Sequence, residues 1–91
     1  MIRSCQDRET QKLFERRFSR KWQAIEAQAR VRLTLLDAAV SLNDLRLPGL
    51  RLEALKGDRK GQHSIRINDQ WRICFRWTKA GPEDVSITDY H

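Results

Sequence analysis

The spacing of the apolar residues changes at Leu47-Pro48-Gly49, and this change constrains the fold more than any other feature of the sequence. Before it, apolar residues recur every three or four positions, as on one side of a helix. After it, they alternate with polar residues, as on a half-buried strand. Because the chain has only 91 residues, the two parts must share one core, and we expect a single domain over residues 1–91.

The first half of the chain predicts two helices. Asp7 is placed as an N-cap, so we expect a short edge strand at residues 2–5 and then a short helix near residues 7–17. The basic run FERRFSRKW interrupts the periodicity and indicates a connection. A second helix is predicted by one continuous apolar stripe, which we expect to cover the sheet: Trp22, Ile25, Ala29, Leu33, Leu36 and Val40.

The second half predicts four strands. Apolar and polar residues alternate over residues 50–54, 64–67, 71–77 and 85–88, and the links between them are KGDRKG, Asn68-Asp69-Gln70 and KAGPED. These links have hairpin length and turn chemistry. The sequence therefore predicts an α+β fold in which two N-terminal helices pack on one face of a small, mainly antiparallel sheet.

Positive charge gathers on the predicted sheet face that points away from the helices. The alternation sends Arg66, Arg72 and Arg76 to that face, on neighbouring strands. The chain carries 18 Lys and Arg against 12 Asp and Glu, a net charge of +6 that is spread through both halves. A small basic domain of this kind usually meets nucleic acid or an acidic protein surface, although basic residues on an edge also serve solubility alone.

Several classes of function lack their sequence signals. Cys5 and Cys74 are far apart and form no metal-binding pattern, so we interpret them as small apolar residues on strands, and we expect no metal and no cofactor. His63 shares the parity of Ile65 and is interpreted as partly buried and structural. The sequence has no apolar run long enough for a membrane span and no secretory signal, so the cytoplasm is the expected location.

The remaining polar groups suit cleavage of RNA without a metal. The 2′-hydroxyl of the substrate is the nucleophile, so the protein needs a proton acceptor, a proton donor and cations for the phosphorane-like charge. Lys56 and Arg72 are the better charge stabilisers, and Tyr90 can also stack on a base. The candidate proton handlers are Glu53, Lys56, Asp89, Tyr90 and His91. An idle imidazole at His91 and simple packing at Tyr90 are the alternatives.

The segment LEALKGDRKGQHSIRINDQWRICFRW, together with ITDYH, resembles the HigB toxins of the RelE-type superfamily. The likeness covers essentially the whole chain, including MIRSC and LDAAVSLNDLRLPG. It implies a RelE-like fold and a ribosome-dependent endonuclease that cuts mRNA in the A site of the 70S ribosome. It also implies a HigA-like helix-turn-helix antitoxin, through which the toxin meets operator DNA only indirectly, and no membrane partner.

Position by position, the resemblance implies roles for five residues. Lys56 is expected to contact the scissile phosphate and Arg72 to stabilise its charge. His91 is the favoured proton-transfer group, Tyr90 positions or stacks the substrate, and Asp89 orients a neighbour.

Glu53 departs from the family pattern, since some members carry a histidine there. Its carboxylate is a candidate base, or a surface acid that pairs with Arg51 or Arg66. This departure keeps two alternatives open: a blocker that binds RNA or the ribosome without cleaving, and an inactive toxin that serves as a co-repressor subunit.

Other basic side chains are expected to bind RNA or the ribosome. Those around the sheet are Arg59, Lys60, Arg66 and Arg76, and those after the first helix are Arg16, Arg17, Arg20 and Lys21. For the second group, a solvated helix end is the alternative.

Overall fold

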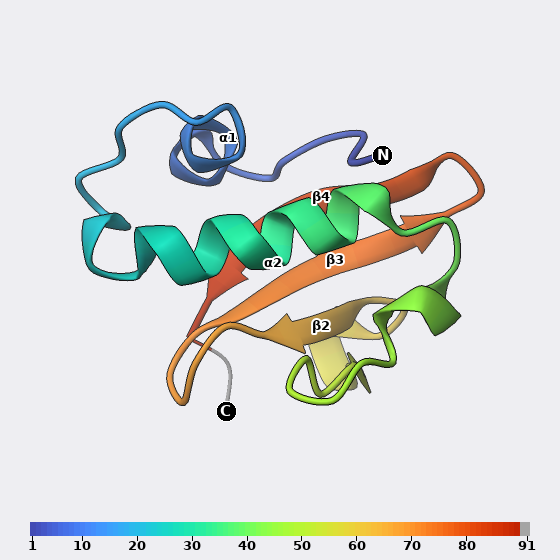
Figure 1. Cartoon of the computed structure of the whole chain (residues 1–91). Helices are drawn as coiled ribbons and strands as arrows, with labels where there is room; N and C mark the ends of the chain where they lie inside the picture. The colour runs from blue at the N-terminus through green and yellow to red at the C-terminus, as the bar shows by residue number, and fades with distance from the viewer. Residues whose placement is uncertain (90–91) are drawn as a thin grey trace.

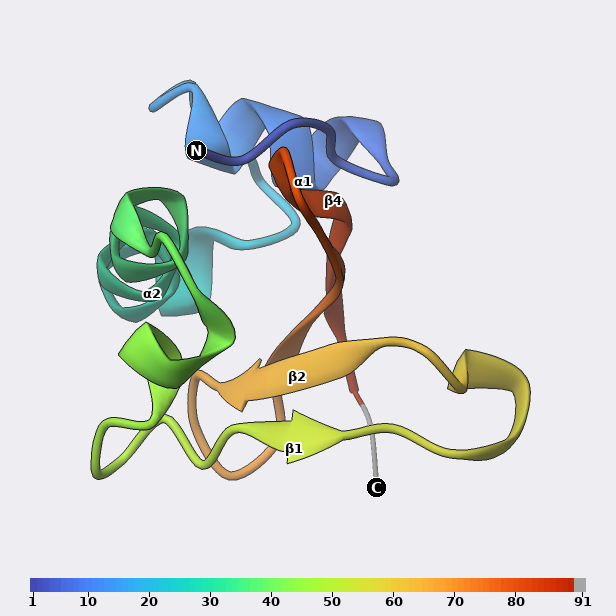
Figure 2. The same cartoon turned by 90° about the vertical axis from the view of Figure 1, so that its right-hand side faces the viewer.

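Two helices cover one face of a four-stranded sheet in the computed structural model, which describes residues 1–89 (Figure 1). The helices are α1 (Arg8–Phe14) and α2 (Glu26–Ala38), with short 3₁₀ turns η1 (Gln23–Ile25), η2 (Leu42–Leu45) and η3 (Gly57–Arg59). The strands are β1 (Glu53–Ala54), β2 (His63–Arg66), β3 (Arg72–Thr78) and β4 (Gly81–Thr88). Figure 2 shows both helices on the same side of the twisted sheet. Within residues 1–89, no helix is long and apolar enough to cross a membrane.

The first helix begins where the sequence predicts. The Asp7 carboxylate accepts a hydrogen bond from the Thr10 backbone N–H at 2.8 Å, which confirms Asp7 as the N-cap. The helix ends at Phe14, three residues before the predicted end. Arg16 adopts the left-handed backbone conformation, with φ of 60°, and a helix cannot continue through it.

The N-terminal segment lies parallel to β4. The Arg3 N–H donates to the Pro82 carbonyl at 2.8 Å, and the Val85 N–H donates to the Ser4 carbonyl at 3.1 Å. The predicted edge strand is therefore present as an extended segment with a single bridge, between Cys5 and Val85. Gly81 permits this approach, because a β-carbon there would collide with the Met1 carbonyl oxygen.

The apolar stripe of the second helix is confirmed in its middle part, whereas Trp22 and Ile25 precede α2 and belong to the start and end of η1. Ala29, Leu33 and Leu36 are fully buried against the sheet. The prediction for Val40 was wrong, because its side chain is 87% exposed. The helix ends at Ala38, and Ala39 turns to extended backbone with ψ of 134°, so Ala39 is buried and Val40 points to solvent.

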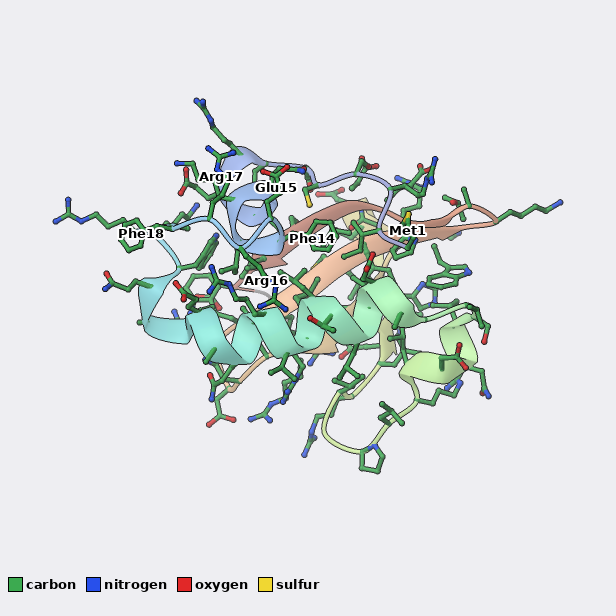
Figure 3. All side chains as sticks on the ribbon, turned by 45° about the horizontal axis from the view of Figure 1, so that its top comes forward. Met1, Phe14, Glu15, Arg16, Arg17 and Phe18 are labelled. Atoms are coloured by element: carbon green, nitrogen blue, oxygen red, sulfur yellow. The ribbon has the colours of Figure 1, made fainter. Side chains whose placement is uncertain are left out.

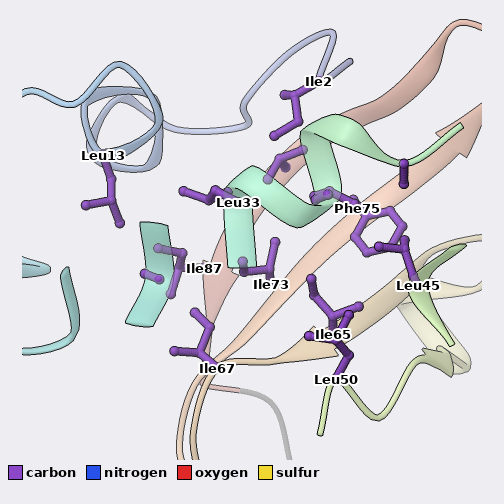
Figure 4. Close-up of a cluster of buried hydrophobic side chains, with 14 of the residues drawn as sticks. Ile2, Leu13, Leu33, Leu45, Leu50, Ile65, Ile67, Ile73, Phe75 and Ile87 are labelled. Carbon is purple, nitrogen blue, oxygen red and sulfur yellow. The ribbon is translucent and has the colours of Figure 1, made fainter. Parts of the chain in front are cut away.

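The predicted strand order is confirmed, since the sheet runs β1-β2-β3-β4 with every neighbouring pair antiparallel. Ile65, Ile73 and Ile87 are cross-strand neighbours in one row facing α2. Figure 4 shows them beside Phe75 and Leu33 in the buried cluster. This cluster fixes the register, because a slip of one residue would bring polar side chains to the core.

The first strand differs from its prediction over residues 50–54. Arg51 adopts a φ of 48°, which interrupts the extended chain, and β1 is limited to Glu53 and Ala54. The burial pattern shifts as a consequence: Ala54 is exposed and Leu55 is buried.

The third link is shorter than KAGPED. Gly81 pairs with Thr78, so the turn consists of Lys79 and Ala80, and the residues from Gly81 to Asp84 belong to β4. A register shift between Cys74 and Arg76 accommodates the extra residue on β4, where Asp84 has a φ of 53°.

Candidate functional site

The sheet face opposite the helices has a polar but buried centre. Glu53, Ser64, Cys74 and Ser86 are cross-strand neighbours in one row of this face, which we call the open face. Ser64 and Cys74 are fully buried and Ser86 is 5% exposed. Buried polar groups normally have hydrogen-bond partners, so we expect a polar side chain or ligand to bond to the hydroxyls of this row.

Arg72 fills this polar centre. Its Nε donates to Ser64 Oγ at 2.7 Å, and its Nη2 donates to the Arg51 carbonyl at 2.6 Å. The Arg72 side chain is only 12% exposed. The left-handed conformation of Arg51 turns its carbonyl toward the guanidinium, so one unusual backbone angle and one buried hydroxyl fix the orientation of Arg72.

Glu53 lies beside Arg72 on the edge strand. Its Oε2 is 3.8 Å from Arg72 Nη2, and its side chain is 55% exposed. An ion pair of this length near solvent contributes little to stability. The long distance and the exposure of Glu53 therefore leave the Arg72 guanidinium only weakly paired with this carboxylate.

A pocket adjoins Arg72 at the β2–β3 turn. We call it the arginine pocket. It has a volume of about 300 Å³, and its lining residues are Arg51, Arg66, Asn68, Asp69 and Arg72. Arg66 and Arg72 are direct cross-strand partners, as the alternation predicts. Arg66 forms an ion pair with Asp69.

The C-terminal residues begin next to Arg72. Thr88 is the cross-strand partner of Arg72, and Asp89 follows directly. Asp89 accepts a hydrogen bond from Gln70 Nε2 at 3.4 Å. Tyr90 and His91, which the sequence places in the site, lie outside the described residues.

Lys56 is exposed and occupies the N-cap position of η3, three residues beyond Glu53. Three residues of extended chain span about 10 Å. The described residues thus bring Arg72, Glu53 and Asp89 to one end of the sheet, with Lys56 further along the edge strand, where the chain enters the β1–β2 loop.

Arg76 does not join Arg66 and Arg72, so the prediction that the three lie side by side was wrong. Arg76 lies opposite Glu83 and its Nε is 3.8 Å from Asp84 Oδ2. A β-carbon on Gly61 would lie 3.6 Å from Arg76 Nη1, so Arg76 is close to the β1–β2 loop. Arg76 lies four residues beyond Arg72 on β3, and four residues of extended chain span about 13 Å.

The β1–β2 loop carries two more of the predicted RNA-binding residues. Arg59 Nη1 donates to Gln62 Oε1 at 3.3 Å, and Lys60 is exposed. Burial raises the pKa of the Cys74 thiol, while a hydrogen bond from Thr88 and the charges of Arg59 and Arg72 oppose the rise. Arg59 therefore lies near enough to the open face for its charge to act on Cys74.

The thiols fit the interpretation of small structural residues. Burial, and then the charges of Asp7 and Glu15, raise the pKa of Cys5 to about 11, so both thiols remain protonated at neutral pH. His63 is partly buried, and its ring is stacked 6.3 Å from that of Phe75. Within residues 1–89, no three His, Cys, Asp or Glu side chains gather where they would hold a metal ion.

The basic residues after the first helix lie in a different region. Arg17 pairs with Glu15 at 3.1 Å, and Lys21 Nζ is 5.0 Å from the ring centre of Trp22. Figure 3 shows Arg16, Arg17 and Phe18 on the loop between α1 and α2, on the helical side of the molecule. Arg20 is exposed on the same loop. These basic side chains of the loop between α1 and α2 are therefore not part of the cluster around Arg72.

Sequence reasoning missed three contributors to the site. Ser64 shares the parity of Arg66, which places it on the open face, but its bond to Arg72 has no sequence signal. The carbonyl of Arg51 depends on a backbone conformation that is rare for arginine. Asp69 was interpreted only as a turn residue, whereas it also pairs with Arg66.

Comparison with known proteins gives a family for this arrangement. Residues 4–91 match the family described as RelE-like toxin of type II toxin-antitoxin system HigB. Toxin HigB-1 of Vibrio cholerae serotype O1 is 51% identical over 60 residues, which cover 65% of this chain and 59% of that protein. Endoribonuclease HigB of Proteus vulgaris is 35% identical over 60 residues, covering 66% of this chain and 65% of that protein.

The aligned part of the chain thus spans less than two thirds of either relative. The family match, in contrast, extends over nearly the whole sequence and includes both helices, all four strands and the residues around Arg72. The chain therefore belongs to the RelE-like HigB toxins of type II toxin–antitoxin systems.

Proposed function

We propose that this toxin is an endoribonuclease that cuts mRNA held in the ribosomal A site and thereby stops translation. The observation that carries the proposal is the nearly buried Arg72 guanidinium, held by Ser64 and the Arg51 carbonyl beside the Glu53 carboxylate. A preorganised cation next to a carboxylate suits a reaction in which a phosphate gains charge while a proton moves. The similarity to the endoribonuclease HigB of Proteus vulgaris supports the same activity.

The reaction needs no external nucleophile. The 2′-oxygen of the RNA attacks the neighbouring phosphorus while its proton passes to a base, and the bond from phosphorus to the 5′-oxygen breaks. The 5′-oxygen takes up a proton, so the products are a 2′,3′-cyclic phosphate and a 5′-hydroxyl. Negative charge grows on the non-bridging oxygens during this step, and fixed donors there lower the barrier.

Arg72 is the proposed donor to those oxygens. Arg72 donates from Nε to Ser64 Oγ and from Nη2 to the Arg51 carbonyl, so among the described residues Nη1 is left for the phosphate. Glu53, 3.8 Å from the guanidinium, is the proposed base. Lys56, Asp89, Tyr90 and His91 keep the roles that the family resemblance gives them: phosphate contact, orientation, substrate positioning and proton transfer.

The partners follow from the same proposal. The net charge of +6 favours approach to ribosomal RNA, and a helix-turn-helix antitoxin would neutralise the toxin in the cytoplasm, where ribosomes are. Operator DNA would be contacted only through that antitoxin.

Primer extension on a defined mRNA tests the proposal. Wild-type toxin is incubated with the message alone, with programmed 70S ribosomes, and with ribosomes plus the product of the neighbouring open reading frame. We expect cuts inside codons only when ribosomes are present, and their suppression by the neighbouring protein. Cuts without ribosomes would overturn the ribosome requirement.

One alternative has support from a particular residue. Glu53 stands where some family members carry a histidine, and its carboxylate is more than half exposed. If it acts only as a counter-ion of Arg72, the toxin would bind the ribosome without cleaving. The same experiment identifies this case, because reverse transcription would then reveal stalled ribosomes without cuts.

A further inference from the structure

The arginine pocket holds more positive charge than the proposed cleavage needs. Arg72 and Lys56 are the proposed contacts of the scissile phosphate, yet Arg51 and Arg66 line the same pocket of about 300 Å³ as Arg72. Arg66 lies directly opposite Arg72 on the neighbouring strand. Like charges in this position destabilise a sheet, so the pair is favourable only when anions lie between or beside the two guanidiniums.

The existing counter-ions are placed where an incoming anion can displace them. Asp69 pairs with Arg66, but its side chain is fully exposed, and such pairs contribute little. The shape of the turn does not depend on Asp69, because the Asn68 side chain accepts hydrogen bonds from Gln70 N–H at 2.9 Å and Trp71 N–H at 2.8 Å. Asp69 can therefore rotate into solvent without opening the hairpin.

The backbone around Arg66 is firmly held. Its N–H donates to the Leu50 carbonyl at 2.6 Å, and its carbonyl accepts from Arg32 Nε at 3.1 Å. The Arg66 side chain is 31% exposed, so solvent and ligands can reach it, while the backbone that carries it is held in place. A cation on a rigid strand with a displaceable partner is suited to phosphate binding.

We propose that the arginine pocket binds a second RNA backbone phosphate, next to the phosphate held by Arg72, and that this phosphate replaces Asp69 at Arg66. The proposal rests on the proposed function, because it takes RNA as the ligand. Cross-strand partners have Cα atoms about 5 Å apart, so two arginine side chains on them reach neighbouring phosphates of one strand. Arg66 contributes affinity and positioning, and Arg72 contributes to the chemical step.

Three variants test the subsite. Arg66→Gln removes the proposed contact, Asp69→Asn removes the competing carboxylate, and Lys79→Gln removes a charge from the β3–β4 turn at the opposite end of β3. Thermal unfolding of each variant shows whether the fold is kept. Two readouts are used: binding to 70S ribosomes carrying a message with a 2′-deoxy nucleotide at the cut site, and single-turnover cleavage of the normal message.

Arg66→Gln is expected to weaken binding about tenfold and to lower the salt slope of log affinity by about one. The cleavage rate at saturating toxin should stay unchanged, because Arg66 does not stabilise the transition state. Asp69→Asn should tighten binding severalfold, and Lys79→Gln should match the wild type. If Arg66→Gln and Asp69→Asn both bind like Lys79→Gln, the subsite does not exist.

A message with one neutral methylphosphonate linkage beside the cut site identifies the source of the phosphate. If the phosphate belongs to the message, this linkage weakens wild-type binding and has no further effect in Arg66→Gln. If it belongs to ribosomal RNA, Arg66→Gln weakens binding equally with both messages. Because the deoxy message reports binding without cleavage, a toxin that binds through Arg66 but never cuts would refute the proposed function and leave the subsite standing.

Discussion

The two faces of the sheet are equally buried along their central rows, but they are built from opposite chemistry. On the face toward α2, the row Ile65, Ile73 and Ile87 is apolar and lies within the hydrophobic cluster. On the open face, the row carries the Ser64 and Ser86 hydroxyls beside the Cys74 thiol, and the Ser64 hydroxyl accepts a hydrogen bond from the Arg72 side chain. Burial on the first face stabilises the fold, whereas burial on the second holds one cation in place.

Stability and the proposed activity therefore depend on different faces of the sheet. Apolar burial contributes about 25 cal/mol for each Å² of surface, which makes the helical face the main source of folding free energy. The polar row gains little net free energy from its hydrogen bonds, since the unfolded chain bonds to water instead. Substitutions on the two faces should therefore affect different measurements.

The largest expected effect is on stability. Phe75→Ala removes a fully buried ring from the helical face, so the free energy of unfolding should fall by about 3–5 kcal/mol. Cys74→Ala, one position earlier and on the open face, should lower it by only about 1 kcal/mol. Urea unfolding of both variants measures the difference. Equal losses would mean that the open face is part of the folding core.

The next effect is on cleavage. Glu53→Gln keeps the shape of the side chain and removes its ability to take a proton, so the single-turnover rate should fall about 100-fold. The variant should fold normally, since its ion pair with Arg72 is long and exposed. A variant that cuts at the wild-type rate would show that another group is the base.

A smaller loss is expected when the support of Arg72 is removed. Ser64→Ala deletes the acceptor of the Nε hydrogen bond, so the cleavage rate should fall about tenfold through misorientation of the guanidinium. In an Arg72→Gln background, the same substitution should have little further effect. Losses that multiply in the double variant would indicate that Ser64 acts independently of Arg72.

An effect that appears only at high pH lies outside both faces. The pKa of Cys5 is raised from 9.0 to about 11 by folding, so above pH 9 the thiol ionises in the unfolded chain first. The unfolded state is then favoured, and the free energy of unfolding should decline between pH 9 and pH 11. Cys5→Ala should reduce this decline in urea unfolding series. An identical decline in both proteins would assign it to other groups.

The sequence predicted what periodicity controls. Two helices, four antiparallel strands in order and the shared face of Arg66 and Arg72 all follow from apolar spacing, and the structure confirms them. Apolar spacing does not predict the backbone conformation of a single residue or a local shift of register. The left-handed Arg51 supplies a carbonyl to Arg72, and the register shift after Cys74 places Arg76 opposite Glu83. Both depend on tertiary contacts that no local pattern records.

In the proposed reaction, Arg72 is fixed on the open face and stabilises the charge of the scissile phosphate. Single-turnover cleavage of ribosome-held mRNA by Arg72→Gln tests it most directly, with thermal unfolding as a check of the fold. Loss of one preorganised donor lowers a rate by about 100- to 1,000-fold, and we predict a loss of that size. A folded Arg72→Gln variant that cuts within about twofold of the wild-type rate would contradict the account.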